Sequence, residues 1–290
     1  MNLGKRRSDE AVAELLIDQL TIVRANVDGA IAGDDPEALH DLRVAVRRSR
    51  TLLKGMPGVF TPADHERFTR ELRELQLITG PVRDYDVLLE DLECFIEERP
   101  ELASESEALR KELMRRRSAA RAKLARRLKS KRFADLLDAW QATIEALPTT
   151  DESDRPDSRT PIGKLSAARI DADRKRFKKL SADAVASGDP AAVHHARKRG
   201  KALRYNLEFF GHLGDKKRSK RLGNRLRKTQ DELGAYQDTV VHEAALREAA
   251  ESAGSVAVAI AAGAMIERAL DERDYRLEQF ERRVARRDKQ

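Results

Sequence analysis

Two stretches of this sequence place one histidine and three basic residues at the same intervals, i, i+3, i+7 and i+10. The residues are His40, Arg43, Arg47 and Arg50 in the first stretch, and His194, Arg197, Lys201 and Arg204 in the second. On an α-helix these positions fall within a strip about 80° wide, so each stretch presents an imidazole and three cations on one face. We call these two sets the first and the second stripe.

A stripe of this kind is suited to binding an extended anion. From His40 to Lys54 the first helix is about 21 Å long at 1.5 Å per residue, which is enough to meet several phosphate groups in succession. Arginine binds phosphate oxygens through two parallel hydrogen bonds, and lysine adds a mobile point charge. A histidine near a helix N-terminus donates a hydrogen bond when neutral and adds charge when protonated. For one stripe alone, a solvated arginine-rich helix face is the alternative interpretation.

The helices that carry the stripes must also position them. The residue before each stripe position is apolar or small: Leu39, Leu42, Val46, Ser49 and Leu53 in the first helix, and Val193, Ala196, Gly200, Leu203 and Leu207 in the second. The stripes therefore lie about 100° from the buried side, at the margin of the core. Asp-Pro pairs at 35–36 and 189–190 predict a capped helix start ahead of each histidine.

The two stripes are part of a longer internal repeat with an offset of 154 residues that needs no gap between residues 35 and 87. We therefore predict two repeats, at 1–147 and 162–290, joined by a proline-containing linker at 148–161 that shows no packing pattern. A pseudo-twofold axis between the repeats would let both basic faces line one groove or pore. Duplication also retains residues by descent, so the repeat alone does not establish a binding site.

The fold class follows from composition and periodicity. Aromatic residues make up 4% of the chain, glycine and proline are scarce, and long segments follow i/i+3/i+4 periodicity without hairpin signals. We expect an all-α protein of two duplicated helical bundles with long helices. The expected helices span 8–32, 36–55, 62–79, 82–98, 104–129, 133–147 and 255–286, with Gly80-Pro81 ending the third.

Positive charge is concentrated in the two matching segments. The whole chain carries +7, whereas residues 194–228 carry a net +11 and residues 40–74 a net +3, which leaves the remainder acidic. This distribution is typical of a polyanion site. It adds further candidate binding residues, which are Lys54, Arg67, Arg70 and Arg73 in the first half and Lys198, Lys217, Lys220, Arg221, Arg225 and Lys228 in the second.

Other kinds of site find little support. Cys94 is the only cysteine, and His65, His212 and His242 lack ligand spacing, so we expect no disulfide, no metal and no cofactor. No glycine-rich phosphate loop and no nucleophile beside a base are present, so we expect no catalysis. Arg83-Asp84 and Gln237-Asp238 are interpreted as N-caps or internal ion pairs.

The expected location is the cytoplasm. A single cysteine is typical of a reducing compartment, and acidic residues interrupt the N-terminal region before an apolar signal segment could form. The most apolar run, residues 254–266, is shorter than the roughly 20 residues of a membrane span. We therefore expect no membrane association.

These motifs resemble the CHAD family, the conserved-histidine α-helical domain. The resemblance rests on residues 39–50, 193–205, 77–87 and 233–238, and it covers nearly the whole chain. It implies two symmetry-related helical bundles whose basic surface binds inorganic polyphosphate, often to target proteins to polyphosphate granules. It also implies that both stripes bind phosphate. Some family members carry a fused triphosphatase domain, for which this sequence has no room.

Two other functions remain open at this point. The stripes could bind a nucleic-acid backbone, although aromatic residues for base stacking are scarce near them, Tyr205 and Phe68 being the closest. A phosphoryl-transfer enzyme is the third interpretation. The sequence does not determine the oligomeric state or a preferred polyphosphate chain length.

Overall fold

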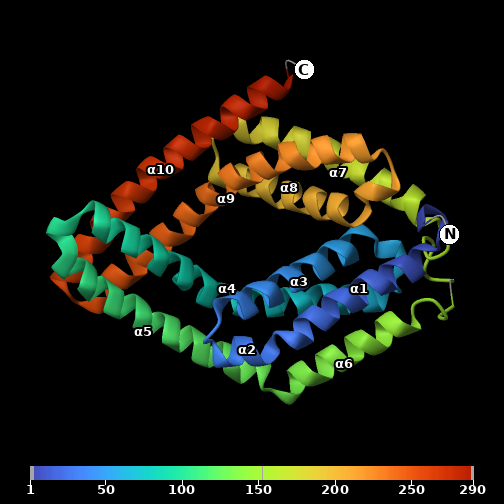
Figure 1. The fold of residues 1–290 in the computed structure, drawn as a ribbon, viewed down its shortest axis with the longest axis horizontal. Coiled ribbons are helices and arrows are strands. Elements are labelled where there is room, and N and C mark those ends of the chain that lie inside the picture. Colours follow the sequence, from blue (N-terminus) through green and yellow to red (C-terminus); the bar gives the residue numbers. More distant parts are fainter. Residues whose placement is uncertain (1–2, 152, 289–290) are drawn as a thin grey trace.

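The computed structural model describes residues 3–151 and 153–288, except for the side chains of 286–288, and these residues form ten α-helices (Figure 1). The helices are α1 (Ser8–Ala25), α2 (Val27–Ala32), α3 (Pro36–Gly55), α4 (Pro62–Glu98), α5 (Ala103–Leu128), α6 (Lys131–Ala146), α7 (Ile162–Ser187), α8 (Pro190–Phe210), α9 (Lys216–Ala253) and α10 (Val256–Asp288). Within that part of the chain the single β feature is an isolated bridge between Arg7 and Pro161. The all-α prediction is confirmed.

The stripe helices α3 and α8 begin where the Asp-Pro pairs predict. Asp35 accepts a hydrogen bond from the backbone N–H of Glu37 at 2.8 Å, and Asp189 accepts from those of Ala191 and Ala192 at 3.1 and 3.3 Å. A proline occupies the first helical position of both, where its missing N–H leaves no bond unmade. His40 and His194 therefore lie about one turn inside a capped N-terminus.

The predicted helix stop at Gly80-Pro81 is wrong, because α4 continues through it to Glu98. Proline removes the hydrogen bond to the carbonyl four residues earlier, which belongs to Leu77. Leu77 is 60% exposed, so water can replace the lost donor. Beyond the proline, the buried side chains of Val82 and Leu88 hold the helix in the core. In the second half, α9 likewise runs through Gly234 without a break.

The predicted opening helix at 8–32 is divided in two. The side-chain amide of Asn26 donates to the carbonyl oxygen of Ile22 at 2.9 Å, and Asn26 leaves the helical conformation with φ −103° and ψ 0°. A side chain that competes for a helix carbonyl in this way favours a helix end. The sequence pattern showed apolar periodicity across Asn26 but not this local competition.

Three hydrophobic clusters hold the helices together. One lies among α1, α3, α4, α5 and α6 and includes Tyr205, Phe209 and Phe210 of α8, and another joins α7 to α8, α9 and α10. The third combines Leu88 and Leu113 of α4 and α5 with Leu246 and Met265 of α9 and α10, where the long helices meet at one end of the molecule (Figure 1). The two predicted repeats therefore share a core at that end. Their twofold relation stays a prediction.

The segment predicted as a linker, 148–161, shows no packing pattern in its sequence, yet it makes hydrogen bonds to both ends of the first half. Arg155 is 1% exposed and donates to the carbonyl oxygens of Leu147 at 2.7 Å and Asp151 at 2.9 Å. The backbone N–H of Asp9 donates to the carbonyl of Ser158 at 2.9 Å. This connection is held by hydrogen bonds to backbone carbonyls, which leave no apolar periodicity to read in a sequence.

Replacing Arg155 with Met should lower the free energy of unfolding by about 2–4 kcal/mol, because it leaves buried carbonyls without donors. Urea unfolding followed by circular dichroism measures the change. Lys164→Met, at an exposed position of α7, is the control and should change stability little. Equal stability of the Arg155 variant and the wild type would contradict the structural role of this connection.

Candidate anion-binding site

The first and second stripes lie at the margin of the core, as the neighbouring apolar residues predict. Arg43, Arg47 and Arg50 on α3 are half-buried, and so are Arg197 and Lys201 on α8. His194 and Arg204 are also half-buried, whereas the side chains of His40, Lys54 and Lys198 are exposed. Packing therefore restrains the central cations of both stripes.

Polar residues on the following long helices hold stripe side chains in place. Nη1 of Arg43 donates to the hydroxyl of Thr79 at 3.2 Å, and Nη1 of Arg50 donates to Oε1 of Gln76, both on α4. Nδ1–H of His194 donates to Oε1 of Gln237 on α9. This bond leaves Nε2 of His194 available to a ligand. None of these partners carries charge, so each orients a stripe residue without neutralising it.

The two stripe helices are joined directly. Arg48 on α3 donates to Glu208 on α8 at 2.8 Å, and the other carboxylate oxygen of Glu208 lies 3.4 Å from Nε of Arg204. The guanidinium of Arg48 also lies over the rings of Tyr205 and Phe209, with 5.9 and 5.7 Å to the ring centres. Glu208 is thus bonded to a cation from each helix, and this contact brings the two stripes together.

Charges from both stripes act on one another. Burial, followed by repulsion from Arg197 and then from Arg47, lowers the pKa of Lys201 to about 6. Burial also lowers the pKa of Arg197. The charge of Asp238 opposes this effect, and the charge of Arg47 on the opposite helix lowers the pKa further. The pKa of Lys54 is lowered by burial, then by Arg50 and by Lys198 of the opposite helix.

The cations near these contacts form a single group, which we call the cationic cluster. Its members are Arg43, Arg47, Arg50, Lys54, Arg73, Arg197, Lys198, Lys201 and Arg204. Among the residues that the structure describes, only Arg204 in this cluster has a carboxylate within 4 Å. Burial followed by repulsion from Arg47 lowers the pKa of Arg43 to about 10.

Two carboxylates stand beside the cationic cluster. Burial and the charge of Asp238 raise the pKa of Asp84, against the opposing effect of Arg43. Asp84 is in the middle of α4 and Asp238 in the middle of α9, so the N-cap interpretation of both is wrong. Arg83 instead makes an ion pair with Glu90 at 3.7 Å.

The outer cations of α4 divide between two sides of the helix. Arg73 belongs to the cationic cluster, because its charge contributes to the lowered pKa of Arg50. Arg67 lies about 180° from Gln76 on the helix and pairs with Glu71 at 3.5 Å in a separate pocket. Arg70 lies 3.9 Å from Glu66. Arg67 and Arg70 are therefore not part of the cationic cluster.

The outer cations of α9 are all exposed. Their positions on the helix place some on the side that faces the second stripe and others away from it. Gln230 lies against Gly200 of α8 and marks the side of α9 that faces the second stripe. Lys220 falls within about 80° of Gln230, whereas four other candidates lie about 140° or more away. Those four are Lys217, Arg221, Arg225 and Lys228.

Several residues of the site were missed in the sequence. Gln76, Thr79 and Gln237 orient stripe side chains, and Arg48 with Glu208 joins the two helices. The expected helix at 62–79 already placed Gln76 about 60° from Arg73, but an uncharged side chain gave no signal of a role in the site. The repeat offset also matches Arg73 to Arg227, which falls within about 60° of Gln230 and is a further candidate.

The aromatic residues considered for base stacking are not available to a ligand. Phe68 is 0% exposed and packs with its ring centre 4.3 Å from that of Trp140, and Tyr205 is 1% exposed. In the described part of the chain, no group of three or more potential ligands is arranged to hold a metal ion. No described helix has an apolar stretch that would cross a membrane.

The structure is therefore an all-α protein in which two capped helices bring half-buried cations together. The sequence matches the CHAD domain over residues 14–247, and the chain belongs to the CHAD family. The fold agrees with this. The crystal structure of the CHAD domain from the plant Ricinus communis superposes with a TM-score of 0.77 and 27% identity, covering 97% of this chain and 93% of that one.

Other proteins are similar over a large part of the chain. PptA from Streptomyces chartreusis shares the fold, with a TM-score of 0.67 and 19% identity over 96% of this chain and 99% of that one. The uncharacterized proteins MT2285 and Rv2226 of two Mycobacterium tuberculosis strains, CDC 1551 / Oshkosh and ATCC 25618 / H37Rv, are each 30% identical over 238 residues, or 74% of this chain. The chain spans 40% of the length of these two relatives.

Replacing Lys201 with Met should stabilise the protein most at neutral pH. The folded-state pKa of Lys201 lies near 6, far below its ordinary value, so unfolding takes up a proton between about pH 6 and 10. Wild-type stability therefore rises with pH in this window, by at most about 1.4 kcal/mol per pH unit from this group. The stability advantage of Lys201→Met should shrink as pH rises, which urea unfolding at pH 6.5 to 9 measures.

The exposed Lys198→Met is the matched control, one helical turn earlier, and should leave the pH dependence of stability unchanged. An advantage of Lys201→Met that stays constant across this pH range would show that Lys201 has an ordinary pKa.

Proposed function

We propose that this protein binds inorganic polyphosphate without catalysing its conversion, and that both stripes contact the same polyphosphate chain. The observation that carries the proposal is the cationic cluster: eight of its nine members lack a carboxylate partner within the described residues, although several are half-buried. Like charges held together at the margin of a core are unfavourable unless a counterion is present. A linear polyanion supplies such counterions along both helices.

The chemistry of the cluster favours phosphate without bases. Its arginines provide fork-shaped donors for phosphate oxygens, and neutral partners already orient Arg43 and Arg50. A single-stranded nucleic acid would instead require aromatic surfaces for its bases, and Phe68 and Tyr205 are buried. Polyphosphate needs only the charges and hydrogen-bond donors that the cluster offers.

We further propose that the two stripes line one basic groove, that the protein acts in the cytoplasm, and that it associates there with polyphosphate granules.

The absence of catalysis is tested by incubating the protein with long-chain polyphosphate and Mg²⁺ or Mn²⁺. We expect the chain length to stay unchanged on a gel, and shortening would contradict the non-catalytic part of the proposal.

The double substitution Arg43→Glu/Arg197→Glu should weaken binding of long-chain polyphosphate by about 100-fold or more. It removes one arginine from each stripe and introduces repulsion, and each lost charge-assisted contact contributes roughly 1.5–3 kcal/mol. Fluorescence anisotropy of labelled polyphosphate at fixed ionic strength measures the affinity.

Lys123→Glu/Arg126→Glu is the matched control, since it makes the same change of charge at two exposed positions of α5. It should alter the affinity only slightly. An equal loss in both variants would mean that total charge, and not the stripes, determines binding. If RNA displaces polyphosphate at equal phosphate concentration, nucleic acid becomes the better assignment of this site.

Polyphosphate binding should tighten as the pH falls from 8.5 to 6. The free protein holds Lys201 with a pKa near 6, and a bound phosphate favours the protonated amine and raises that pKa. Binding at pH 8 should therefore take up nearly one proton. Calorimetry in buffers of different ionisation enthalpy measures this uptake. Lys201→Gln should remove most of it, and an uptake that persists in this variant would contradict the assignment to Lys201.

A further inference from the structure

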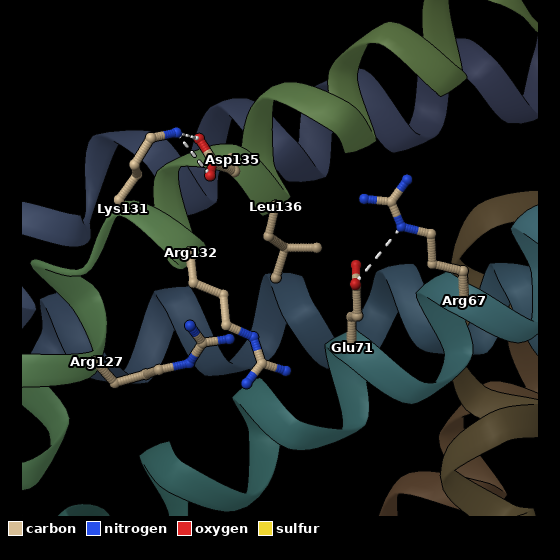
Figure 2. A pocket seen from close by; sticks show the side chains of 7 residues that line it. All are labelled: Arg67, Glu71, Arg127, Lys131, Arg132, Asp135 and Leu136. Carbon is tan, nitrogen blue, oxygen red and sulfur yellow. Dashed lines mark hydrogen bonds and ion pairs between the residues drawn. The ribbon is translucent and has the colours of Figure 1, made fainter.

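A second cationic site lies on the opposite side of α4 from the cationic cluster. A surface pocket of about 240 Å³ is formed where α4, α5 and α6 meet (Figure 2). It is lined by Arg67, Glu71, Arg127, Lys131, Arg132, Asp135 and Leu136. None of these residues belongs to the cationic cluster, so this pocket is separate from the proposed polyphosphate site.

Three of the four cations in this pocket are paired with carboxylates. Arg67 lies 3.5 Å from Glu71, the amine of Lys131 lies 2.7 Å from Asp135, and Arg132 donates at 2.8 Å to Glu74 beside the pocket. The fourth cation, Arg127, differs from them.

Arg127 has no carboxylate within 4 Å among the described residues. Nη1 of Arg127 donates a 3.3 Å hydrogen bond to the hydroxyl of Ser130. Burial lowers the pKa of Arg127, and the neighbouring charge of Arg132 lowers it further, against the weaker opposing effects of Glu74 and Glu71, neither of which pairs with it. Figure 2 shows the guanidinium groups of Arg127 and Arg132 together on one side of the pocket. Two adjacent guanidinium groups, one of them unneutralised, form a site for one tetrahedral oxyanion.

The rest of the lining restricts the kind of anion. Glu71 is directed into the pocket between Arg67 and Arg132 (Figure 2), and its side chain is 21% exposed. A carboxylate repels a second phosphate group but accepts a hydrogen bond from a hydroxyl. Leu136 adds an apolar surface for carbon atoms.

The size of the pocket also points to a small ligand. Pockets for drug-sized ligands measure about 300–1,000 Å³, and this one is smaller. We propose that it binds a small phosphomonoester that carries hydroxyl groups. The phosphate lies between Arg127 and Arg132, and a hydroxyl donates to Glu71. This inference does not depend on polyphosphate binding by the stripes.

Titration calorimetry of the full chain with glycerol 3-phosphate tests the proposal. The titration uses the Arg43→Gln/Arg197→Gln background, which weakens phosphate binding at the cationic cluster. We expect saturable binding that Arg127→Gln weakens by about tenfold or more. Arg126→Gln, one residue earlier and exposed, removes the same charge outside the pocket and should leave the affinity unchanged.

Two further variants are needed. One tests how the ligand is oriented in the pocket, and the other replaces Arg127→Gln if that variant does not fold. Glu71→Gln should reduce the preference for glycerol 3-phosphate over inorganic phosphate, because it weakens the acceptor for the hydroxyl. Arg127→Lys retains the charge, so it decides the outcome if circular dichroism shows that Arg127→Gln is unfolded. It should bind more weakly than the parent.

No detectable binding, or equal binding by the parent and the folded Arg127 variant, would overturn the proposed site. An unchanged preference in Glu71→Gln would overturn the hydroxyl contact. Because the titration is made without functional stripes, its failure leaves the polyphosphate proposal unaffected.

Discussion

Electrostatic repulsion among half-buried cations on α3 and α8 is the interaction on which the site depends. Burial lowers the pKa values of Arg197 and Lys201, and the charge of Arg47 across the helix pair lowers both further. Protein interiors usually pair such charges, because removing an ion from water is unfavourable. The fold leaves these charges unpaired and therefore disposed to bind an anion.

The surrounding structure keeps these cations in place despite that repulsion. Capped N-termini fix where α3 and α8 begin, and the apolar residues beside each stripe anchor both helices in the core. Glu208 bonds to Arg48 and Arg204 and so joins the two helices. Gly200 has no side chain and allows Gln230 and Phe177 to approach α8 closely. The stability of the hydrophobic clusters thus maintains a site that is itself unfavourable without a ligand.

The sequence was sufficient for the fold class and the stripe helices, because both depend on local signals. Asp-Pro caps and the offset between apolar and basic positions are readable without a structure. Pro81 misled the prediction, since tertiary packing outweighs the single hydrogen bond that proline removes. At Asn26 the prediction failed in the opposite way, because a helix was predicted to continue through an unbroken apolar pattern and the Asn26 side chain ends it.

The site was predictable only in part for a related reason. Arg67 and Arg73 look alike in sequence, and only the packing of α4 shows which of them lies with the stripes. Gln76, Thr79 and Gln237 carry no charge and gave no signal of their role. The lowered pKa of Lys201 depends on neighbours from two helices that are far apart in the chain.

We propose that both stripes bind one polyphosphate chain together. The salt dependence of the binding constant tests it most directly, because each cation that neutralises a phosphate adds roughly 0.7–0.9 to the slope of log K against log salt concentration. The comparison requires Arg43→Gln/Arg47→Gln in the first stripe and Arg197→Gln/Arg204→Gln in the second. The account predicts a similar decrease of the slope in both variants. A slope that changes in only one of them would contradict a shared site.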